Sequence, residues 1–547
     1  NNFNMKKFLF LFFVSLIIFS WNFKREIILY AMPILINASN PIDSNRIIEW
    51  PEGNIQDKTN KPNIILILAD DMGFNDVSFY NGGAADGSLK TPNIDKLAKE
   101  GVAFTNGYAA SPVCSASRAA IMTGRYSSRY GFEFTPYPAR AAAITNLMRR
   151  DDELATIRIE GVELDELGLD VGGLPNEEIT VAELLQENGY YTAHIGKWHL
   201  GGFTNGMRPI DQGFDDSLMM HSGLYLPENH PDVVNAKVDS SVEDMIWASM
   251  QYATSFNGSK PFEPAGYLTD YYTDEAVKVI NNNKDRPFFL YLAQWAVHNP
   301  LQSLKKDYEK HQHMDNHNLQ VYSGMIEALD RSIGRVMDAL EENGLTENTL
   351  IIFTSDNGGA GYIGLNDINK PYRGWKLTHF EGGMHVPFFA KWPSKIEPES
   401  IYDKRIHHTD IFSTILGAAN IEEPESIKID GENLLPFILT NKKGQPHETL
   451  YWKNSTYQAI IHNNWKLMRS EEPIKQEFLY DLKQDPYEQN NLVSVALDTK
   501  DLLNKMLDKH VKSMPKPTWP QSVLMPVPID KPNTEEFNEG DELIYWP

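Results

Sequence analysis

Cysteine and positive charge are both scarce in this chain. Its 547 residues include one cysteine, Cys114, so no disulfide can form within the chain. Lys and Arg number 50 against 74 Asp and Glu, and the formal net charge is −24. This acidity excludes broad nucleic-acid binding, because phosphate backbones are held by basic surfaces. An anionic substrate must therefore be bound by a local group of positive side chains.

Long hydrophobic runs are also few. Residues 8–20 form an apolar run after a Lys-Lys pair, and this length is typical of a signal peptide and short for a membrane span. We therefore predict that residues 1–38 are a signal peptide and processing region and that the protein is periplasmic or secreted. No stable membrane association is expected after cleavage. Residues 27–36 are apolar again, so an uncleaved N-terminal anchor is the alternative.

Short apolar runs in the body of the chain predict strands that are buried on both faces. These runs cover residues 63–69, 190–195, 287–293, 349–354 and 386–390. The overall composition, 41% hydrophobic and 23% charged, supplies enough apolar side chains for a large core.

Helical patterns separate these runs. Thr91 with Pro92 predicts a capped helix start, Thr180 with Glu183 predicts a capping box, and residues 326–340 carry apolar side chains at helical spacing. Alternating strands and helices predict an α/β fold with a large mixed, mainly parallel sheet sandwiched by helices. We expect residues 60–445 to form this domain.

The character of the chain changes near residue 446. Residues 459–462 and 465–468 predict two strands joined by a hairpin turn, and residues 502–511 predict an amphipathic helix. We expect residues 446–547 to form a smaller C-terminal α+β subdomain with a short antiparallel sheet and a proline-rich tail. Aromatic residues in the tail favour an extended path over the body of the protein.

Polar residues follow several of the predicted strands. They are Asp70, Asp71, Lys197, His199, His298, Asp356 and Asn357. Because ligands bind at the carboxyl edge of open α/β sheets, we expect these groups to converge there. The three aspartates and the asparagine offer only hard oxygen ligands, which suit Ca²⁺ or Mg²⁺. Alternatively, each acidic pair caps the next helix or turn.

The lone cysteine lies in the segment SPVCSASRAAIMTG, residues 111–124. Small residues follow Cys114, and Arg118 lies four positions further on. This pattern fits a reactive cysteine at a helix start, with a lowered pKa. A buried structural cysteine is the alternative.

The segment CSASR at residues 114–118 resembles the C-x-P/A-x-R motif of the type I sulfatases. Ala116 stands where many members carry proline, and His385 stands where arginine is common; we interpret His385 as structural. Other motifs similar to the family follow in the family's order. They are ADDMG at 69–73, GYYTAHIGKWHLG at 189–201, HNP at 298–300, SDNGG at 355–359, RGWKLTHFEGG at 373–383 and LYDLKQDPYEQNNL at 479–492.

This resemblance, over residues 61–495, implies the alkaline-phosphatase-like sulfatase fold, with residues 60–445 as the catalytic domain. It implies that a maturation enzyme oxidises Cys114 to formylglycine, whose hydrated aldehyde attacks the sulfate ester and gives a covalent sulfo-enzyme. It also implies one bound Ca²⁺. The implied metal ligands are the oxidised residue Cys114 with Asp70, Asp71, Asp356 and Asn357.

The resemblance also implies roles for the cationic residues. Lys197 and Lys376 would hold the sulfate oxygens, and Arg118 would hold the aldehyde hydrate. His298 would protonate the leaving alcohol, a role that suits a side chain titrating near neutral pH. His199 would assist the second hydroxyl of the hydrate, whose deprotonation expels sulfate.

We expect the substrate to be a sulfated oligo- or polysaccharide, first an algal polysaccharide fragment and next a glycosaminoglycan. Residues 132–178 and 220–265 do not fit the strand–helix alternation and predict long loops near the site. In the second stretch, Tyr225, Trp247 and Tyr252 are candidates for stacking on sugar rings. The alternatives are an arylsulfatase, a phosphomonoester or phosphonate ester hydrolase, and a non-catalytic protein that binds sulfated glycans.

Overall fold

The structure is a computed structural model. It describes residues 24–54, 59–84, 87–135, 144, 146–149, 154–159, 172–201, 206–439 and 444–547. The apolar run at residues 8–20 and part of the stretch 132–178 lie outside the described residues.

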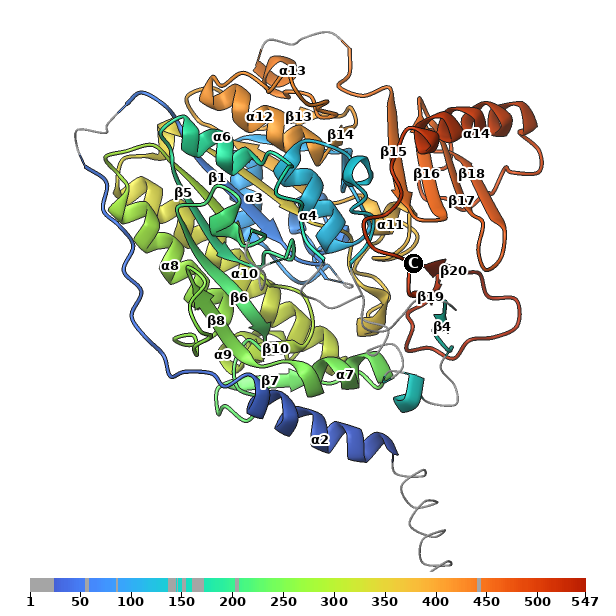
Figure 1. Ribbon diagram of the computed structural model, residues 1–547, viewed down its shortest axis with the longest axis horizontal. Helices are drawn as coiled ribbons and strands as arrows, with labels where there is room; N and C mark the ends of the chain where they lie inside the picture. The colour runs from blue at the N-terminus through green and yellow to red at the C-terminus, as the bar shows by residue number, and fades with distance from the viewer. Residues whose placement is uncertain are drawn as a thin grey trace, which may run out of the picture.

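A nine-stranded sheet forms the centre of the protein (Figure 1). Strand β1 is parallel to β11 and β9, β5 is parallel to β9 and β6, and β13 is parallel to β2. Strands β12 and β8 run antiparallel to their neighbours. The predicted mixed, mainly parallel sheet is confirmed. In spatial order the strands are β13 (Ser400–Tyr402), β2 (Val102–Phe104), β12 (Phe388–Lys391), β11 (Thr349–Ser355), β1 (Asn63–Ala69), β9 (Phe288–Ala293), β5 (Tyr191–Gly196), β6 (Asp216–Gly223) and β8 (Tyr252–Phe256).

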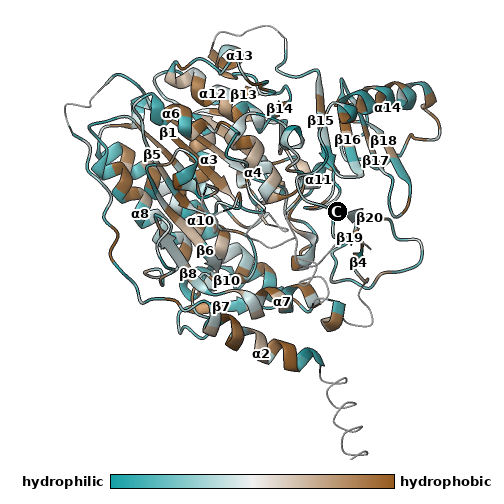
Figure 2. Cartoon of the chain, in the orientation of Figure 1, coloured by the Kyte–Doolittle hydropathy of each residue, from teal (hydrophilic) through white to brown (hydrophobic). Residues whose placement is uncertain are grey.

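Strand β1 is buried along its whole length and divides its side chains between two cores. Ile65 and Ile67 belong to the hydrophobic cluster on one face of the sheet, and Ile64, Leu66 and Leu68 belong to the cluster on the other. This division follows from the two-residue period of a strand. An apolar run without alternation is therefore the pattern of a strand covered on both faces, and Figure 2 shows hydrophobic ribbon in the central strands.

Helices cover both faces of the sheet (Figure 1). Helices α3 (Pro92–Lys99), α8 (Leu268–Asn282) and α10 (His317–Glu342) pack on the first face. Helices α4 (Cys114–Thr123), α6 (Val181–Glu187) and α12 (Thr409–Ala419) pack on the second. The helix predicted over residues 326–340 lies within α10, which begins nine residues earlier, at His317.

The two predicted helix starts differ in outcome. Thr180 and Glu183 form the predicted capping box of α6, with reciprocal backbone bonds of 3.1 and 2.7 Å. Thr91 precedes α3, but its side chain does not cap the helix. Its hydroxyl instead donates to the Asp95 carboxylate and accepts from the Ser78 amide, both at 3.0 Å. A competing tertiary partner thus replaces the predicted cap.

The stretch 220–265 is not the long loop that we predicted. It contains β7 (Val233–Ala236), α7 (Ser241–Ser249) and β8, and β7 pairs with β10 (Leu301–Leu304). Tyr225, Trp247 and Tyr252 are buried, with exposed fractions of 0%, 8% and 9%. The expectation that these rings stack on sugars is therefore wrong, because they fill the protein core.

A four-stranded antiparallel sheet lies beside the main body (Figure 1). It consists of β15 (Thr449–Asn454), β16 (Tyr457–His462), β17 (Trp465–Ser470) and β18 (Gln476–Asp481), and α14 (Leu497–Lys512) packs on it. The hairpin turn at Asn463 has the expected left-handed backbone, with φ of 52°. The α+β character expected of the C-terminal part is confirmed.

The tail after α14 is more ordered than a simple extended wrap. Strands β19 (Val523–Pro528) and β20 (Leu543–Trp546) form a small antiparallel sheet with β4 (Ile157–Arg158). Trp519 packs edge-on against Phe132, with ring centroids 4.8 Å apart. The tail is therefore an integral part of the packed protein.

Shorter elements complete the described chain. Helix α2 packs beside α7, where Arg25 forms an ion pair with Asp244. No helix among the described residues is both long and apolar enough to cross a membrane. The remaining elements are α2 (Lys24–Ser39), β3 (Gly107–Tyr108), α9 (Lys305–Tyr308), α11 (Glu381–Met384), β14 (Ile406–His407) and α13 (Leu435–Leu439).

Candidate active site

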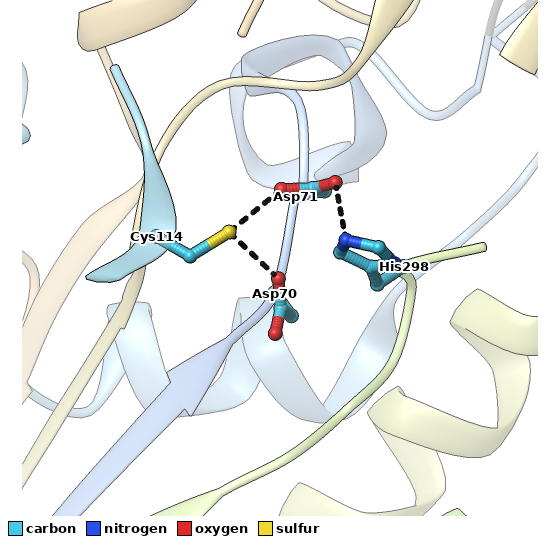
Figure 3. A group of neighbouring side chains, drawn as sticks. All are labelled: Asp70, Asp71, Cys114 and His298. Atoms are coloured by element: carbon cyan, nitrogen blue, oxygen red, sulfur yellow. Dashed lines mark hydrogen bonds and ion pairs between the residues drawn. The ribbon is translucent and has the colours of Figure 1, made fainter. Parts of the chain in front are cut away.

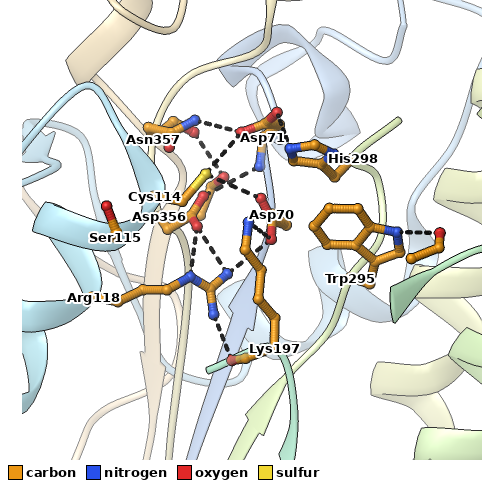
Figure 4. A network of polar contacts seen from close by, with 12 residues as sticks. Asp70, Asp71, Cys114, Ser115, Arg118, Lys197, Trp295, His298, Asp356 and Asn357 are labelled. Carbon is orange, nitrogen blue, oxygen red and sulfur yellow. Dashed lines mark hydrogen bonds and ion pairs between the residues drawn. The ribbon is translucent and has the colours of Figure 1, made fainter. Parts of the chain in front are cut away.

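The carboxyl ends of four neighbouring strands bring the candidate residues together (Figure 4). Asp70 follows β1 and Asp356 follows β11, and the register pairs Ala69 with Ser355. The parallel register therefore places the two acidic pairs side by side. Asp71 has a left-handed backbone, with φ of 57°, and its amide donates to Asp356 Oδ1 at 3.2 Å. Within the described residues these carboxylates face one another and their cationic partners, not the next helix.

Arg118 on α4 binds two of these carboxylates. Its guanidinium donates to Asp356 Oδ2 at 2.8 Å and to Asp70 Oδ2 at 3.1 Å, and none of the three side chains is exposed. A third nitrogen of the guanidinium donates to the Lys197 carbonyl and to Tyr291 Oη. The planar fork thus fixes the positions of three segments at once.

Two lysines complete the charge balance. Lys197 Nζ lies 2.6 Å from Asp70 Oδ2 and stacks over the Trp295 ring, 4.7 Å from its centroid. Lys376 Nζ lies 2.7 Å from Asp71 Oδ1. Both ammonium groups are almost fully buried, and removal of either would leave a carboxylate unpaired in the interior.

Burial and neighbouring charge move the pKa values of the two aspartates in opposite directions. Burial and the nearby Asp356 carboxylate raise the pKa of Asp70 to about 6, against the opposing effect of Lys197. Burial also opposes ionisation of Asp71, but Lys376 and Lys197 outweigh it and hold its pKa below the usual range. A cation at Asp70 would lower its pKa and favour the ionised form.

The carboxylate and amide oxygens at this edge of the sheet fit a hard cation. Asp70, Asp71, Cys114 and His298 each bring one possible ligand atom to within 4.8 Å of the others (Figure 3). Asn357 Nδ2 donates to Asp71 Oδ1 at 2.7 Å, whereas Asn357 Oδ1 is buried and has no hydrogen-bond partner in the described part of the chain. A buried amide oxygen without a donor, beside carboxylate oxygens, is suited to Ca²⁺.

Cys114 opens α4 with its side chain directed at the aspartates (Figure 3). Its Sγ lies 3.5 Å from Asp70 Oδ1 and 3.6 Å from Asp71 Oδ1, and the residue is 1% exposed. Burial and the neighbouring carboxylates raise the pKa of the thiol well above its usual value. The prediction of a cysteine with a lowered pKa is therefore wrong, because burial and the neighbouring carboxylates outweigh the effect of the helix start.

His298 is held on several sides. Its ring stacks on Trp295, with centroids 3.9 Å apart, and its Nδ1 donates to the Asn299 carbonyl at 2.6 Å. This bond leaves Nε2 of the neutral ring to accept from Lys376 Nζ at 3.3 Å. Burial and the two lysines hold the pKa of His298 well below its usual value. The expectation that it titrates near neutral pH is wrong for the free protein.

His199 has a strained backbone and lines a cavity together with Cys114 and His298. Its φ is 61°, and its Nδ1 is buried without a hydrogen-bond partner among the described residues. Burial and the nearby cations lower its pKa well below the usual value. A neutral imidazole that lines a cavity can accept a proton from a bound molecule.

His385 lies away from these residues. Its ring contacts the Glu381 carboxylate at 3.0 Å and the Thr105 carbonyl at 2.9 Å, and stacks on Tyr372. These contacts give it a role in packing.

Sequence reasoning missed several side chains of the site. Tyr362 Oη donates to Asp71 Oδ2 at 3.2 Å and accepts from Lys376 Nζ at 3.2 Å. Tyr225 Oη contacts the carbonyls of Trp295 and His298 at 2.9 and 2.8 Å. Tyr362 lies three residues beyond the SDNGG motif, and this spacing was the one available signal. Tyr225 was predicted only to stack on a sugar ring, so its contact with the His298 segment was missed.

A cavity of about 330 Å³ opens onto this cluster. Cys114, His199, His298, Tyr362 and Lys376 line its inner end. Its volume lies at the lower end of the range of small-molecule sites, ~300–1,000 Å³. The predicted nucleophile Cys114, the predicted acid His298 and Lys376 thus share one cavity.

Comparison with known proteins identifies the family. The Sulfatase family model matches residues 62–421, most of the chain. The chain belongs to the sulfatase family. Sulfuric ester hydrolysis is accordingly its activity, and its α/β fold is the one that the resemblance implied. A second model, N-sulphoglucosamine sulphohydrolase, C-terminal, matches residues 374–516.

Similar proteins are found among curated relatives and solved structures. N-acetylgalactosamine-6-sulfatase of Mus musculus is 33% identical over 417 residues, which cover 74% of this chain and 71% of the relative. Uncharacterized sulfatase YdeN of Escherichia coli is 32% identical over 420 residues, covering 72% and 69%. The crystal structure of Ps i-CgsB in complex with k-i-k-neocarrahexaose has a TM-score of 0.68 and 30% identity, covering 84% and 94%.

A buried carboxylate behind His298 makes the stability of the sulfatase depend on pH. Glu243 is 1% exposed and accepts from Asn299 Nδ2 at 2.7 Å and from Trp247 Nε1 at 2.8 Å. Burial raises its pKa from 4.5 to about 7. Because the folded-state pKa is raised, the contribution of the neutral Glu243 carboxyl group to the free energy of unfolding is fully present below its unfolded pKa of 4.5. This contribution is lost as the pH rises through about 7.

We predict that Glu243→Gln removes this loss. Between pH 5 and pH 8 the free energy of unfolding should fall more in the wild type than in the variant, by on the order of 3 kcal/mol. Urea unfolding at several pH values measures the difference. Glu309→Gln, at an exposed position, is the matched control and should follow the wild type. Parallel pH profiles for the wild type and Glu243→Gln would contradict the prediction.

Proposed function

We propose that the protein is an exported, calcium-dependent sulfatase that hydrolyses a sulfate ester of a saccharide and releases inorganic sulfate. The observation that carries this proposal is the meeting of Cys114 with Asp70, Asp71 and Asn357 beside a cavity that Cys114 itself lines. Export rests on the basic and apolar N-terminal residues.

The proposed calcium ligands are Asp70, Asp71, Asp356, Asn357 and residue 114. A bound Ca²⁺ polarises a sulfate oxygen and lowers the pKa of a hydroxyl beside it. The site is balanced for such an ion, because three carboxylates face Arg118, Lys197 and Lys376. Adding a divalent cation leaves a positive site in an acidic protein, which favours a sulfate monoanion.

We also propose that a maturation enzyme oxidises Cys114 to formylglycine, as the family resemblance implies. The raised pKa of the thiol argues against an unmodified thiolate nucleophile. The hydrated aldehyde carries two hydroxyl groups on one carbon: one can be sulfated, and deprotonation of the other expels the sulfate. A serine at this position has no second hydroxyl for that release.

The chain's own residues supply charge and protons. Lys197 and Lys376 are proposed to turn from the aspartates to the sulfate oxygens. His298 Nε2 is the proposed acid for the leaving alcohol, because a sulfate monoanion bound beside it favours the protonated ring. Trp295 stacks on that ring, and the Tyr225 hydroxyl donates to the backbone carbonyl of His298. His199 Nδ1, without a partner in the described residues, is the proposed acceptor of the proton from the second hydroxyl.

A sulfated saccharide is the proposed substrate class. The support is the name of the mouse relative, an N-acetylgalactosamine-6-sulfatase, and the oligosaccharide named in the complex of Ps i-CgsB. We propose an algal polysaccharide fragment first and a glycosaminoglycan second. An aryl sulfate is the second candidate, because apolar side chains such as Val242, Ile246 and Leu377 line much of the cavity wall.

The nucleophile is tested by Cys114→Ala. We expect sulfate release from a panel of defined sulfated oligosaccharides to fall below detection, because the variant has no hydroxyl that can be sulfated. Mass spectrometry of the wild-type peptide containing residue 114 should show the aldehyde or its hydrate. An active Cys114→Ala variant would refute the proposed nucleophile.

Calcium is tested by its effect on stability as well as activity. Treatment with a chelator should lower the melting temperature and abolish sulfate release, and added Ca²⁺ should restore both. Calcium at ~100 times its Kd should add about 2.7 kcal/mol to the free energy of unfolding. Asp70→Asn should lose this calcium response, and Asp76→Asn, a buried aspartate bound to Tyr322, should keep it. An equal response in both variants would rule out the assigned site.

The proposed acid is tested by changing the leaving group. His298→Ala should reduce kcat/KM by ~10²–10⁴-fold for a sugar sulfate, whose alkoxide needs a proton. The loss should be much smaller for 4-nitrophenyl sulfate, whose phenolate leaves without one. His313→Ala, an exposed histidine, is the control. Equal losses on both substrates would show that His298 acts on another step.

A further inference from the structure

The last part of the chain lines the active-site cavity although it lies outside both family models. Those models end at residues 421 and 516, whereas β19, β20 and the loop between them span residues 523–546. Side chains of this segment lie on the same cavity as Cys114 and His298. They are Met525, Val527, Asn533, Glu535, Phe537 and Trp546.

The segment is fastened to the loops that carry active-site residues. Arg373, three residues before Lys376, donates to both Asp530 oxygens and to Glu542 Oε2, each at 2.6 Å. The Asn533 amide donates to the Gly361 carbonyl at 3.3 Å, next to Tyr362. These hydrogen bonds therefore connect the loop between β19 and β20 to the segments that carry Tyr362 and Lys376.

Packing at the other end of the segment fixes the wall of the cavity. Trp546 is 2% exposed and meets the Tyr457 ring edge-on, with centroids 6.4 Å apart. Strand β19 pairs with β4 at Leu524 and Ile157, and Leu154 and Thr156 before that pair also line the cavity. Since these segments are far apart in sequence, the wall is a built feature of the tertiary fold.

The exposed part of this wall carries polar and aromatic side chains. Asn533 supplies an amide with both donors and acceptors, and Glu535 supplies a carboxylate that Asn366 Nδ2 orients at 3.2 Å. Phe537, half-buried beside them, offers an aromatic face for the apolar face of a pyranose ring. A few polar groups set in an apolar wall is the usual composition of a specific ligand site.

We infer that the segment 523–547 forms the binding site for the sugar that leaves as the alcohol, with Asn533, Glu535 and Phe537 recognising its ring and hydroxyl groups. This inference rests on the proposed saccharide substrate. It assigns substrate selection to a part of the chain that the sulfatase family models do not include. The proposed sulfate-binding residues, Lys197 and Lys376, lie outside this segment.

The test separates sugar binding from sulfate binding. We compare Asn533→Ala and Phe537→Ala with the wild type, and Glu536→Gln, an exposed neighbour that does not line the cavity, is the control. The probes are N-acetylgalactosamine-6-sulfate, k-i-k-neocarrahexaose and 4-nitrophenyl sulfate, with inorganic sulfate as a competitive inhibitor. The readouts are kcat, KM, the inhibition constant of sulfate and the melting temperature.

We expect each variant to raise KM for the hydrolysed sugar about tenfold, which corresponds to ~1.4 kcal/mol. The inhibition constant of inorganic sulfate and the melting temperature should stay at the wild-type values. Unchanged KM, or a KM and inhibition constant that rise together, would overturn the inference while leaving the sulfatase proposal intact. Wild-type turnover of 4-nitrophenyl sulfate with neither sugar hydrolysed would instead overturn the saccharide substrate, and the inference with it.

Discussion

Three carboxylates and three cationic side chains are buried together at one edge of the sheet, and their pairing constrains the rest of the structure. Asp70, Asp71 and Asp356 have almost no exposed surface, and each needs a cation from another segment: Arg118 from α4, Lys197 from the end of β5 and Lys376 from the loop before α11. An unpaired charge in such a place costs several kcal/mol. The parallel register of β1 and β11, the seating of α4 and the path of the Lys376 loop are therefore mutually dependent. Acidity over the whole surface does not prevent anion binding, because this local balance decides the charge inside the cavity.

Much of this arrangement could be predicted from the sequence, for physical reasons. Strand β1 reads NIILILA because both of its faces are covered, and such a run allows few other structures. Polar residues directly after parallel strands must meet at one edge, so Asp70 and Asp356 could be placed together without knowing any helix. Lys376 was different, since it follows no strand of the sheet and came only from the family resemblance.

Other features depend on tertiary context that a linear pattern does not contain. The rings of Tyr225, Trp247 and Tyr252 are as suited to a core as to a sugar site, and the pairing of β7 with β10 and of β8 with β6 decides in favour of the core. The low pKa of His298 arises from its burial and from two lysines that lie far away in sequence. The position of the tail in the cavity wall depends on Arg373 meeting Asp530, a contact between residues 157 positions apart.

The depth at which Cys114 lies has a consequence for how the protein comes into being. With 1% of its surface exposed and the last strands of the chain in the cavity wall, the thiol is out of reach of a second protein in the folded structure. Under the proposed oxidation, folding of the chain therefore competes with the maturation enzyme for Cys114. A molecule that folds before oxidation keeps Cys114 as a thiol. The yield of active protein therefore depends on the rate of oxidation relative to the rate of folding, and not on the affinity of the maturation enzyme.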